Sequence, residues 1–210
     1  MAVSGLLFVF YVLMHMYGNL KAFAGQEAFD EYAGHLREIL MPILPYGGFL
    51  WLFRVLLIVA VIAHVWAAVV LWRRANHARG SRYAVRKRVA ATISSEWMRW
   101  GGVALLLFIV FHLLQFTTST IRVDGEYYAS PYERMVAGFE PWWVVAIYLL
   151  ALVALAMHLR HGVWSACQTL GLIRSRTSTK AVNVVAVLVA AVVSIGFALV
   201  PLAVLFGLVK

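Results

Sequence analysis

Cysteine and acidic residues are scarce in this chain. A single cysteine, Cys167, occurs among 210 residues, which excludes an internal disulfide and a four-cysteine iron–sulfur cluster made by this chain alone. Asp and Glu total nine, and none of them lies inside the long apolar runs. The strands of a transmembrane β-barrel alternate polar and apolar residues, and none of the long apolar runs shows this alternation. The expected membrane structure is therefore helical.

Apolar residues, by contrast, make up 63% of the chain, and the mean hydropathy is +0.85. A soluble core does not use that much apolar surface, so we predict an integral membrane protein. A helix needs about 20 apolar residues to cross the hydrocarbon layer. The predicted fold is all-α, with residues 1–210 forming a single domain of five transmembrane helices. The five runs occupy residues 3–21, 49–72, 98–118, 142–160 and 181–208.

Basic residues outnumber acidic residues by 18 to nine and give a net charge of +9. They concentrate in two loops, between the second and third runs and between the fourth and fifth. The positive-inside rule places both loops in the cytoplasm, so we predict a cytoplasmic N-terminus and a C-terminus outside. The basic residues then orient the protein in the membrane and contact lipid headgroups. We therefore expect no nucleic-acid partner. The two loops contain Arg73, Arg74, Arg79, Arg82, Arg86, Lys87, Arg88 and Arg99, and Arg160, Arg174, Arg176 and Lys180.

Four of the seven histidines lie in four different apolar runs. An ionisable side chain at membrane depth is costly and marks a functional site. We compared their depths by counting residues from the ends of the runs, at about 1.5 Å of rise per residue. His15 and His112 lie slightly to the outer side of the bilayer midplane, whereas His64 and His158 lie slightly to its cytoplasmic side. We name these the outer pair and the inner pair.

Two facing imidazoles at one depth are suited to holding a haem iron from both sides, a coordination typical of electron-transfer cytochromes. The two pairs therefore predict two b-type haems. A single histidine could instead bond a neighbouring helix. A proton relay of histidines is another alternative, although the runs offer no Asp or Glu to share it. A zinc ion needs four ligands around one point, which two separate levels exclude.

Other polar residues near the pairs are candidate haem contacts. His161 follows His158 by three residues and shares its helix face, so it ranks second as a ligand, and we expect it to be an interfacial or propionate-contacting group. Arg54 lies inside the second run and is expected either to extend to the outer surface or to pair with a haem propionate. Arg99 and Arg160 are the equivalent candidates at the inner face.

The loops on the outer side contain two predicted short helices. Apolar residues recur at helical spacing from Phe29 to Leu40, and Pro42 ends the pattern. This pattern, with acidic residues on the other faces, is typical of an amphipathic helix on a membrane surface. In the next outer loop, Ser130 and Glu133 have the spacing of a capped helix start with Pro in the first turn.

Several segments resemble one family of membrane cytochromes. Residues 15–20 and 25–29 resemble the first helix and outer loop of the cytochrome b membrane subunit of succinate dehydrogenase, in its actinobacterial form with one five-helix anchor and two haems. Residues 98–102, continued to His112, resemble its third helix, and residues 158–164 resemble its fourth. The similarity covers nearly the whole chain, and the two histidine pairs match the haem ligands of the family.

The resemblance implies a multi-pass subunit of succinate dehydrogenase or fumarate reductase in the bacterial plasma membrane, which does not itself oxidise succinate. It would anchor a flavoprotein subunit containing FAD and an iron–sulfur subunit, and pass their electrons through two haems b. The acceptor would be a membrane quinone, expected to be menaquinone. Candidate quinone contacts are Asn19, Lys21 and Gln115 on the outer side and Trp97 on the inner side.

One position departs from related fumarate reductases, which carry Glu two residues before the ligand on the fourth helix. Here that residue is Ala156, so the carboxylate of that proton route is missing. Two alternatives to the proposed role stay open. One is a haem-free structural anchor whose quinone takes electrons directly from the iron–sulfur subunit. The other is a stand-alone transmembrane cytochrome b.

Overall fold

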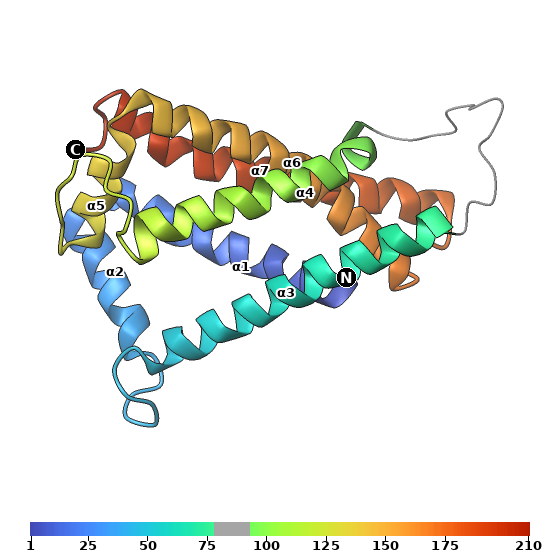
Figure 1. The fold of residues 1–210 in the computed structure, drawn as a ribbon, viewed down its shortest axis with the longest axis horizontal. Helices are drawn as coiled ribbons and strands as arrows, with labels where there is room; N and C mark the ends of the chain where they lie inside the picture. Colours follow the sequence, from blue (N-terminus) through green and yellow to red (C-terminus); the bar gives the residue numbers. More distant parts are fainter. Residues whose placement is uncertain (78–92) are drawn as a thin grey trace.

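Five long helices make up most of the protein (Figure 1). The computed structural model describes residues 1–77 and 93–210, and these residues contain no strand. Each long helix is apolar enough to cross a membrane, which confirms the prediction of an all-α membrane protein with five transmembrane helices. They are α1 (Ala2–Leu20), α3 (Gly48–His77), α4 (Ile93–His112), α6 (Trp142–Thr169) and α7 (Arg176–Leu205).

The last two helices extend beyond the apolar runs that predict them. α6 continues past residue 160 to Thr169, and α7 begins at Arg176, ahead of its apolar run. The start of α7 is a capping box, because the Ser175 and Ser178 side chains each accept a hydrogen bond from the other residue's backbone N–H. Polar turns of this kind satisfy the free N–H groups of a helix. Hydropathy alone therefore underestimates how far these helices reach.

Two short helices lie at one end of the bundle, as the outer loops predict. A 3₁₀ turn, η1 (Lys21–Ala24), leads into α2 (Gln26–Glu38), and α5 (Pro131–Phe139) precedes α6. The Ser130 side chain accepts a hydrogen bond from the backbone N–H of Glu133 at 3.2 Å, which confirms the predicted cap.

Polar contacts tie α2 to α5. The carboxylate of Asp30 accepts hydrogen bonds from the Ser130 hydroxyl and from the Tyr132 backbone N–H. The amide of Gln26 donates to the carboxylate of Glu133 at 3.2 Å. These bonds connect the first outer loop to the second and close this end of the bundle.

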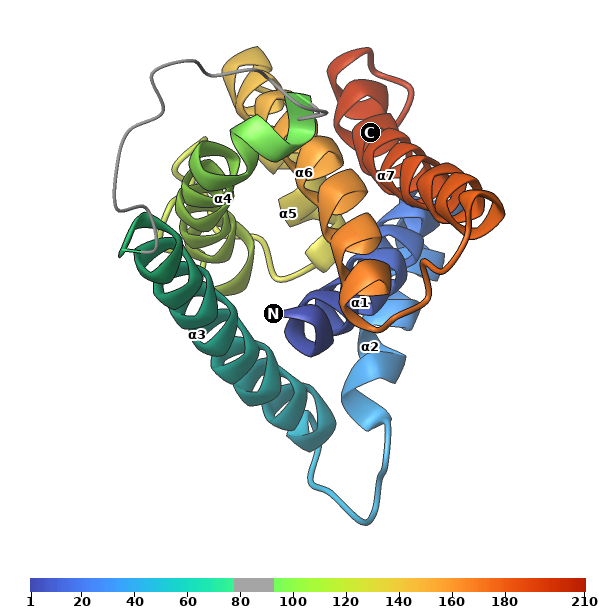
Figure 2. The same ribbon diagram turned by 90° about the vertical axis from the view of Figure 1, so that its right-hand side faces the viewer.

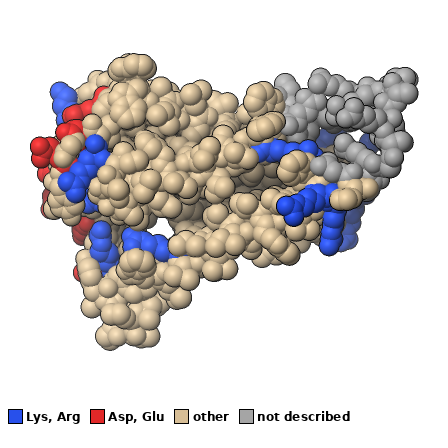
Figure 3. Space-filling view, viewed as in Figure 1, with Lys and Arg blue, Asp and Glu red and all other residues tan. Residues whose placement is uncertain are grey.

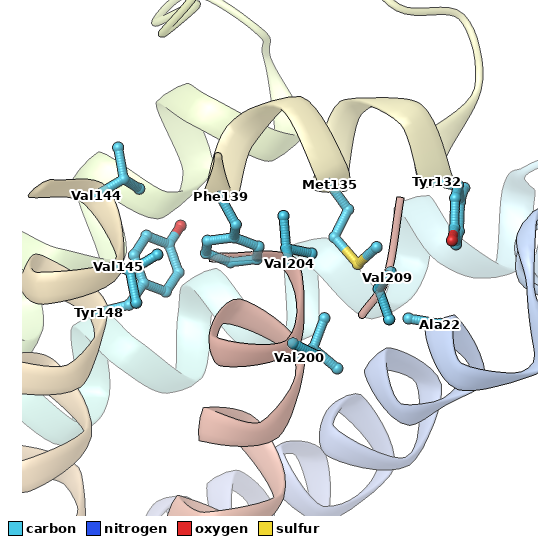
Figure 4. Close-up of a cluster of buried hydrophobic side chains, with 11 residues drawn as sticks. Ala22, Tyr132, Met135, Phe139, Val144, Val145, Tyr148, Val200, Val204 and Val209 are labelled. Atoms are coloured by element: carbon cyan, nitrogen blue, oxygen red, sulfur yellow. The ribbon is translucent and has the colours of Figure 1, made fainter. Parts of the chain in front are cut away.

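A well-packed core lies under α5 (Figure 4). Met135 and Phe139 of α5 meet Tyr148 of α6 together with Val200 and Val204 of α7. Lipid tails are as apolar as these side chains, so close packing rather than exclusion from water is the main attraction between membrane helices. The dense packing makes this the most constrained end of the molecule.

The remaining helices pack unevenly around α6. α6 lies along α7, and α4 and α1 pack on α6 as well. α1 also contacts α7, where the Met16 side chain fills the space beside Gly196. α3 packs mainly on α1 and α2, and its N-terminal half stands apart from α4 and α6 in both views (Figures 1 and 2). A small gap between the N-terminal part of α3 and the rest of the bundle is visible in the space-filling view (Figure 3), although α3 contacts α1 and α2.

Charged side chains gather at the two ends of the bundle (Figure 3). The acidic side chains in this view lie at the end that carries α2 and α5, and the opposite end shows Lys and Arg. The C-terminus lies at the acidic end, and the N-terminus lies on the side of the basic end (Figure 1). The direction of insertion stays a prediction. Five residues of the first basic loop lie outside the described residues, namely Arg79, Arg82, Arg86, Lys87 and Arg88.

Candidate functional site

Four histidines, each on a different transmembrane helix, form two pairs. The ring centroids of His15 on α1 and His112 on α4 are 5.8 Å apart. Those of His64 on α3 and His158 on α6 are 6.2 Å apart. The structure thus brings together the outer pair and the inner pair that the comparison of depths predicts. The described residues contain no group of three or more His, Cys, Asp and Glu side chains placed to hold a metal ion, so the two pairs are separate units.

Aromatic rings surround the outer pair. Tyr11 stacks on His15, with ring centroids 5.4 Å apart and an angle of 11° between the planes. Phe197 of α7 lies 5.6 Å from the same imidazole. Phe116 lies 5.5 Å from the ring of His112. These large, rigid rings restrict the orientation of both imidazoles.

A chain of hydrogen bonds connects His112 to α5. His112 Nδ1 lies 3.1 Å from Tyr148 Oη, and the Tyr148 hydroxyl donates to Gln115 Oε1 at 2.9 Å. Gln115 Nε2 donates in turn to the backbone carbonyl of Gly138 at 3.2 Å. The outer pair is therefore anchored to the packed end of the bundle by polar contacts as well as by rings.

Gln115 lies in a widened turn of its helix. After His112 the chain forms a π-helix, η2 (Leu113–Thr117), and turns of this type are frequent at functional sites. Gln115 is 4% exposed and is the one buried polar side chain among the described residues. Its burial is tolerated because its amide group has partners on both sides.

Small residues line the inner pair. Ser4 Oγ lies 3.1 Å from His64 Nδ1. A Cβ atom placed on Gly5 would lie 3.8 Å from His64 Cε1, and one on Gly102 would lie 3.7 Å from His158 Cε1. Each inner imidazole therefore faces a glycine of a neighbouring helix, Gly5 on α1 for His64 and Gly102 on α4 for His158. His158 Nδ1 is buried and has no hydrogen-bond partner among the described residues.

The second-ranked ligand, His161, lies at the margin of the inner pair. It is one turn beyond His158 on α6, and its ring centroid is 6.4 Å from that of Trp164. Arg160, the adjacent candidate on α6, is half-buried. Both residues are therefore on the helix that carries an inner histidine, nearer to its C-terminal end.

Arg54 and Arg99 each contact a tryptophan ring. Arg54 Cζ lies 5.1 Å from the ring centre of Trp51 on the same helix. Arg99 Cζ on α4 lies 5.6 Å from the ring centre of Trp72 on α3. Both arginine side chains are exposed, so these cation–π contacts sit at the surface of the bundle.

The predicted quinone contacts are divided between the two ends of the bundle. Asn19 Nδ2 donates to the backbone carbonyl four residues earlier at 2.7 Å, and Lys21 Nζ lies 5.3 Å from the ring centre of Tyr17. Gln115 also lies toward this end but is buried. Trp97 lies near the start of α4, at the opposite end, and is 55% exposed. The structure does not bring these four residues into one site.

A small hollow at the outer end is lined in part by Arg134, which donates to the backbone carbonyls of Phe116 at 3.3 Å and Tyr128 at 3.0 Å. Its volume is about 20 Å³, room for roughly one water molecule. In the same loop, the Tyr128 hydroxyl donates to the Asp124 carboxylate at 2.6 Å. This bond raises the pKa of Tyr128 to about 12 and lowers the pKa of Asp124.

Tyr148 and Ser4 are candidate site residues that sequence reasoning missed. Tyr148 is the one hydroxyl-bearing residue within 142–160, and a lone hydroxyl in such a run was an available signal. Its partner His112 lies on a different helix, so no spacing within one helix predicts their contact. The same holds for Ser4 on α1 and His64 on α3.

A family comparison bears on the identity of this bundle. Residues 73–208 match a family model described as the succinate dehydrogenase/fumarate reductase transmembrane subunit. The match covers more than half of the chain and includes His112 and His158, one histidine of each pair. No curated protein and no solved structure matches the chain.

Proposed function

The chain belongs to the succinate dehydrogenase/fumarate reductase transmembrane subunit family, and from this premise we propose that it is a dihaem electron-transfer subunit of a succinate:quinone oxidoreductase. In this proposal the chain anchors a flavoprotein subunit, which contains FAD and oxidises succinate, and an iron–sulfur subunit. Electrons from the iron–sulfur subunit pass through the chain to a quinone, which we propose is menaquinone. The complex is proposed to lie in a bacterial plasma membrane.

The pairing of the four histidines is the observation that carries the proposal. His15 with His112, and His64 with His158, would each hold one haem b. Ring centroids 5.8 and 6.2 Å apart are compatible with one metal ion bonded to both rings, since a metal–imidazole bond is about 2 Å long. A haem held by two imidazoles supplies one-electron transfer, because both axial positions are filled.

The surroundings of the pairs also fit this group. Gly5 and Gly102 carry no side chain where they face the inner imidazoles, which leaves space beside both rings. A haem-free structural anchor leaves that space without a function.

We further propose that the basic loops face the cytoplasm and dock the iron–sulfur subunit there. The inner pair then lies nearer to that subunit than the outer pair does. Arg99, Arg160 and His161 are the proposed contacts for the propionates of the inner haem, and Arg54 is the proposed contact for the outer haem. The quinone is proposed to bind at the outer end, where Asn19 and Lys21 would supply its polar contacts. Gln115, the third predicted contact, is buried with both ends of its amide bonded within the protein.

Haem content and copurifying partners test the proposal. A pyridine-haemochrome assay of the purified complex should give two haems b per chain. A value of zero would support a haem-free anchor, and a value of one would disprove the two-pair scheme. An FAD protein and an iron–sulfur protein should copurify with the chain, and their absence from a haem-loaded preparation would favour a stand-alone cytochrome b.

A further inference from the structure

We infer that Tyr148 and Ser4 are positioning residues, each of which holds one histidine of a pair with its Nε2 atom free to bind iron. Through these contacts they would set the reduction potentials of the two haems separately. The inference rests on the proposed function, because it treats the histidines as haem ligands. It follows from the direction of each hydrogen bond around His112 and His64.

The direction of the bonds around Tyr148 is determined by a backbone carbonyl. The carbonyl of Gly138 only accepts, so the group of Gln115 that faces it at 3.2 Å is the Nε2 amide nitrogen. The Oε1 atom of Gln115 is then the acceptor for the Tyr148 hydroxyl at 2.9 Å. Because this bond uses the single proton of that hydroxyl, Tyr148 Oη accepts from His112 Nδ1–H at 3.1 Å. His112 thus carries its proton on Nδ1, and Nε2 presents a lone pair.

The same reasoning applies to Ser4, at the other level. The Ser4 hydroxyl lies 3.1 Å from the backbone carbonyl of Met1 and 3.1 Å from His64 Nδ1. We assign its single proton to the carbonyl, which only accepts, so that Ser4 Oγ accepts from His64 Nδ1–H and His64 Nε2 presents a lone pair. One histidine of each pair thus has a defined tautomer. Tyr148 of α6 sets it for His112 at the outer level, and Ser4 of α1 sets it for His64 at the inner level.

A histidine that donates its second N–H to an acceptor is a more basic metal ligand and has a fixed ring orientation. A more basic ligand stabilises ferric over ferrous iron, so each acceptor lowers the potential of its own haem. Removing the acceptor should raise that potential and leave the other haem unchanged. The reduction potentials of the two proposed haems are therefore set separately, by Tyr148 on α6 and Ser4 on α1.

The experiment is a redox titration of the purified, haem-loaded complex, followed through the absorption bands of the two haems. Three variants are compared with the wild type: Tyr148→Phe, Ser4→Ala and, as a matched control, Tyr11→Phe. The Tyr148→Phe variant keeps the ring and its edge contacts with Phe108 and Phe139, both at 4.8 Å. Tyr11 stacks on His15, so its variant removes a hydroxyl beside the same haem without touching the bond to His112.

We expect Tyr148→Phe to raise the midpoint potential of one haem and Ser4→Ala to raise that of the other, while Tyr11→Phe shifts neither. Low-spin spectra should persist in all three variants, because no ligand is removed. Unchanged or lowered potentials in Tyr148→Phe, or a shift of the same haem by Tyr148→Phe and Ser4→Ala, would overturn the inference. An equal shift by Tyr11→Phe would also overturn it. Ser4→Ala tests it independently of packing at the outer end, and a wild-type complex without two haems would instead disprove the proposed function.

Discussion

The outer and inner pairs consist of the same side chains but are held in different ways. The outer pair lies beside the packed core under α5, with Tyr11, Phe197 and Phe116 against its imidazoles. The inner pair faces glycines, and one of its histidines comes from α3, a helix that packs mainly on α1 and α2. The outer level is therefore positioned by several aromatic rings and a packed core, whereas the inner level depends on fewer contacts between helices, among them the Phe8 ring 5.7 Å from His64. Substitutions at the two levels should have unequal consequences.

Removal of a proposed ligand should have the largest effect and should separate the pairs. We expect His158→Ala to reduce the haem content from two to one per chain, because the proposed inner haem would lose one of its two imidazole ligands. His161→Ala is the matched control on the same helix and should keep both haems. Pyridine-haemochrome assay of both purified variants gives the answer. Loss of a haem from the His161 variant, with both haems retained in the His158 variant, would reverse the assignment.

The terms inner and outer depend on the direction of insertion, which protease protection can measure. In right-side-out vesicles, the loop between residues 73 and 99 should resist added protease, because the positive-inside rule places it in the cytoplasm. Inside-out vesicles are the control and should be cut there. Cleavage of this loop from the outside would show the opposite direction of insertion. The pair now called outer would then lie nearer to the cytoplasm and come first in the proposed electron path.

The two proposed haems would lie at different depths, which should make quinone reduction sensitive to the membrane potential. Electrons moving outward from the inner level, with the outside positive, gain about 2.3 kcal/mol per 100 mV for a full crossing. We therefore expect an uncoupler to lower succinate:menaquinone activity in sealed vesicles, but not activity with an artificial acceptor at the flavin. An unchanged quinone activity would place quinone reduction at the inner face, near Trp97, Arg99 and His161.

Glycine substitutions should show that the outer level is the more tightly packed. A Cβ on Gly138 would lie 2.9 Å from Phe116 ring atoms and 3.1 Å from Gln115 Nε2, so Gly138→Ala should cost about 1–3 kcal/mol through overpacking. Gly101→Ala is the control on α4, where the added Cβ would meet no atom within 4 Å. Thermal unfolding in detergent should show a lower midpoint for the first variant only. Equal midpoints would remove the distinction in packing between the levels.

The smallest expected effect concerns the loop at the outer end. The hydrogen bond to Asp124 raises the pKa of Tyr128 to about 12, so this bond stabilises the loop below the ordinary tyrosine value of 10.0 and is lost as the pH rises through about 12. Asp124→Asn should lower the pKa of Tyr128 toward 10.0. Phenolate absorbance against pH measures the shift, and Tyr128→Phe identifies the signal. A titration curve identical to that of the wild type would show that the carboxylate does not hold Tyr128.

Much of the site was predictable because helix rise converts residue number into depth. Counting along four apolar runs was enough to pair His15 with His112 and His64 with His158, and the structure brings those rings together. The Ser130 cap and the amphipathic pattern before Pro42 likewise predicted α5 and α2. The ends of α6 and α7 were not predictable in this way, because they are determined by polar capping bonds rather than by hydropathy.

The sequence by itself determined the class of the protein, its five spans and the depth of each histidine, because hydropathy and helix rise are local properties of the chain. Only the tertiary structure decided which atoms meet across helices: Tyr148 with His112, Ser4 with His64, and glycines against the inner imidazoles. Those contacts depend on how each helix is rotated and how closely it approaches its neighbours. Nothing in an apolar run specifies that rotation, since lipid and a neighbouring helix are equally apolar partners and side-chain packing makes the choice.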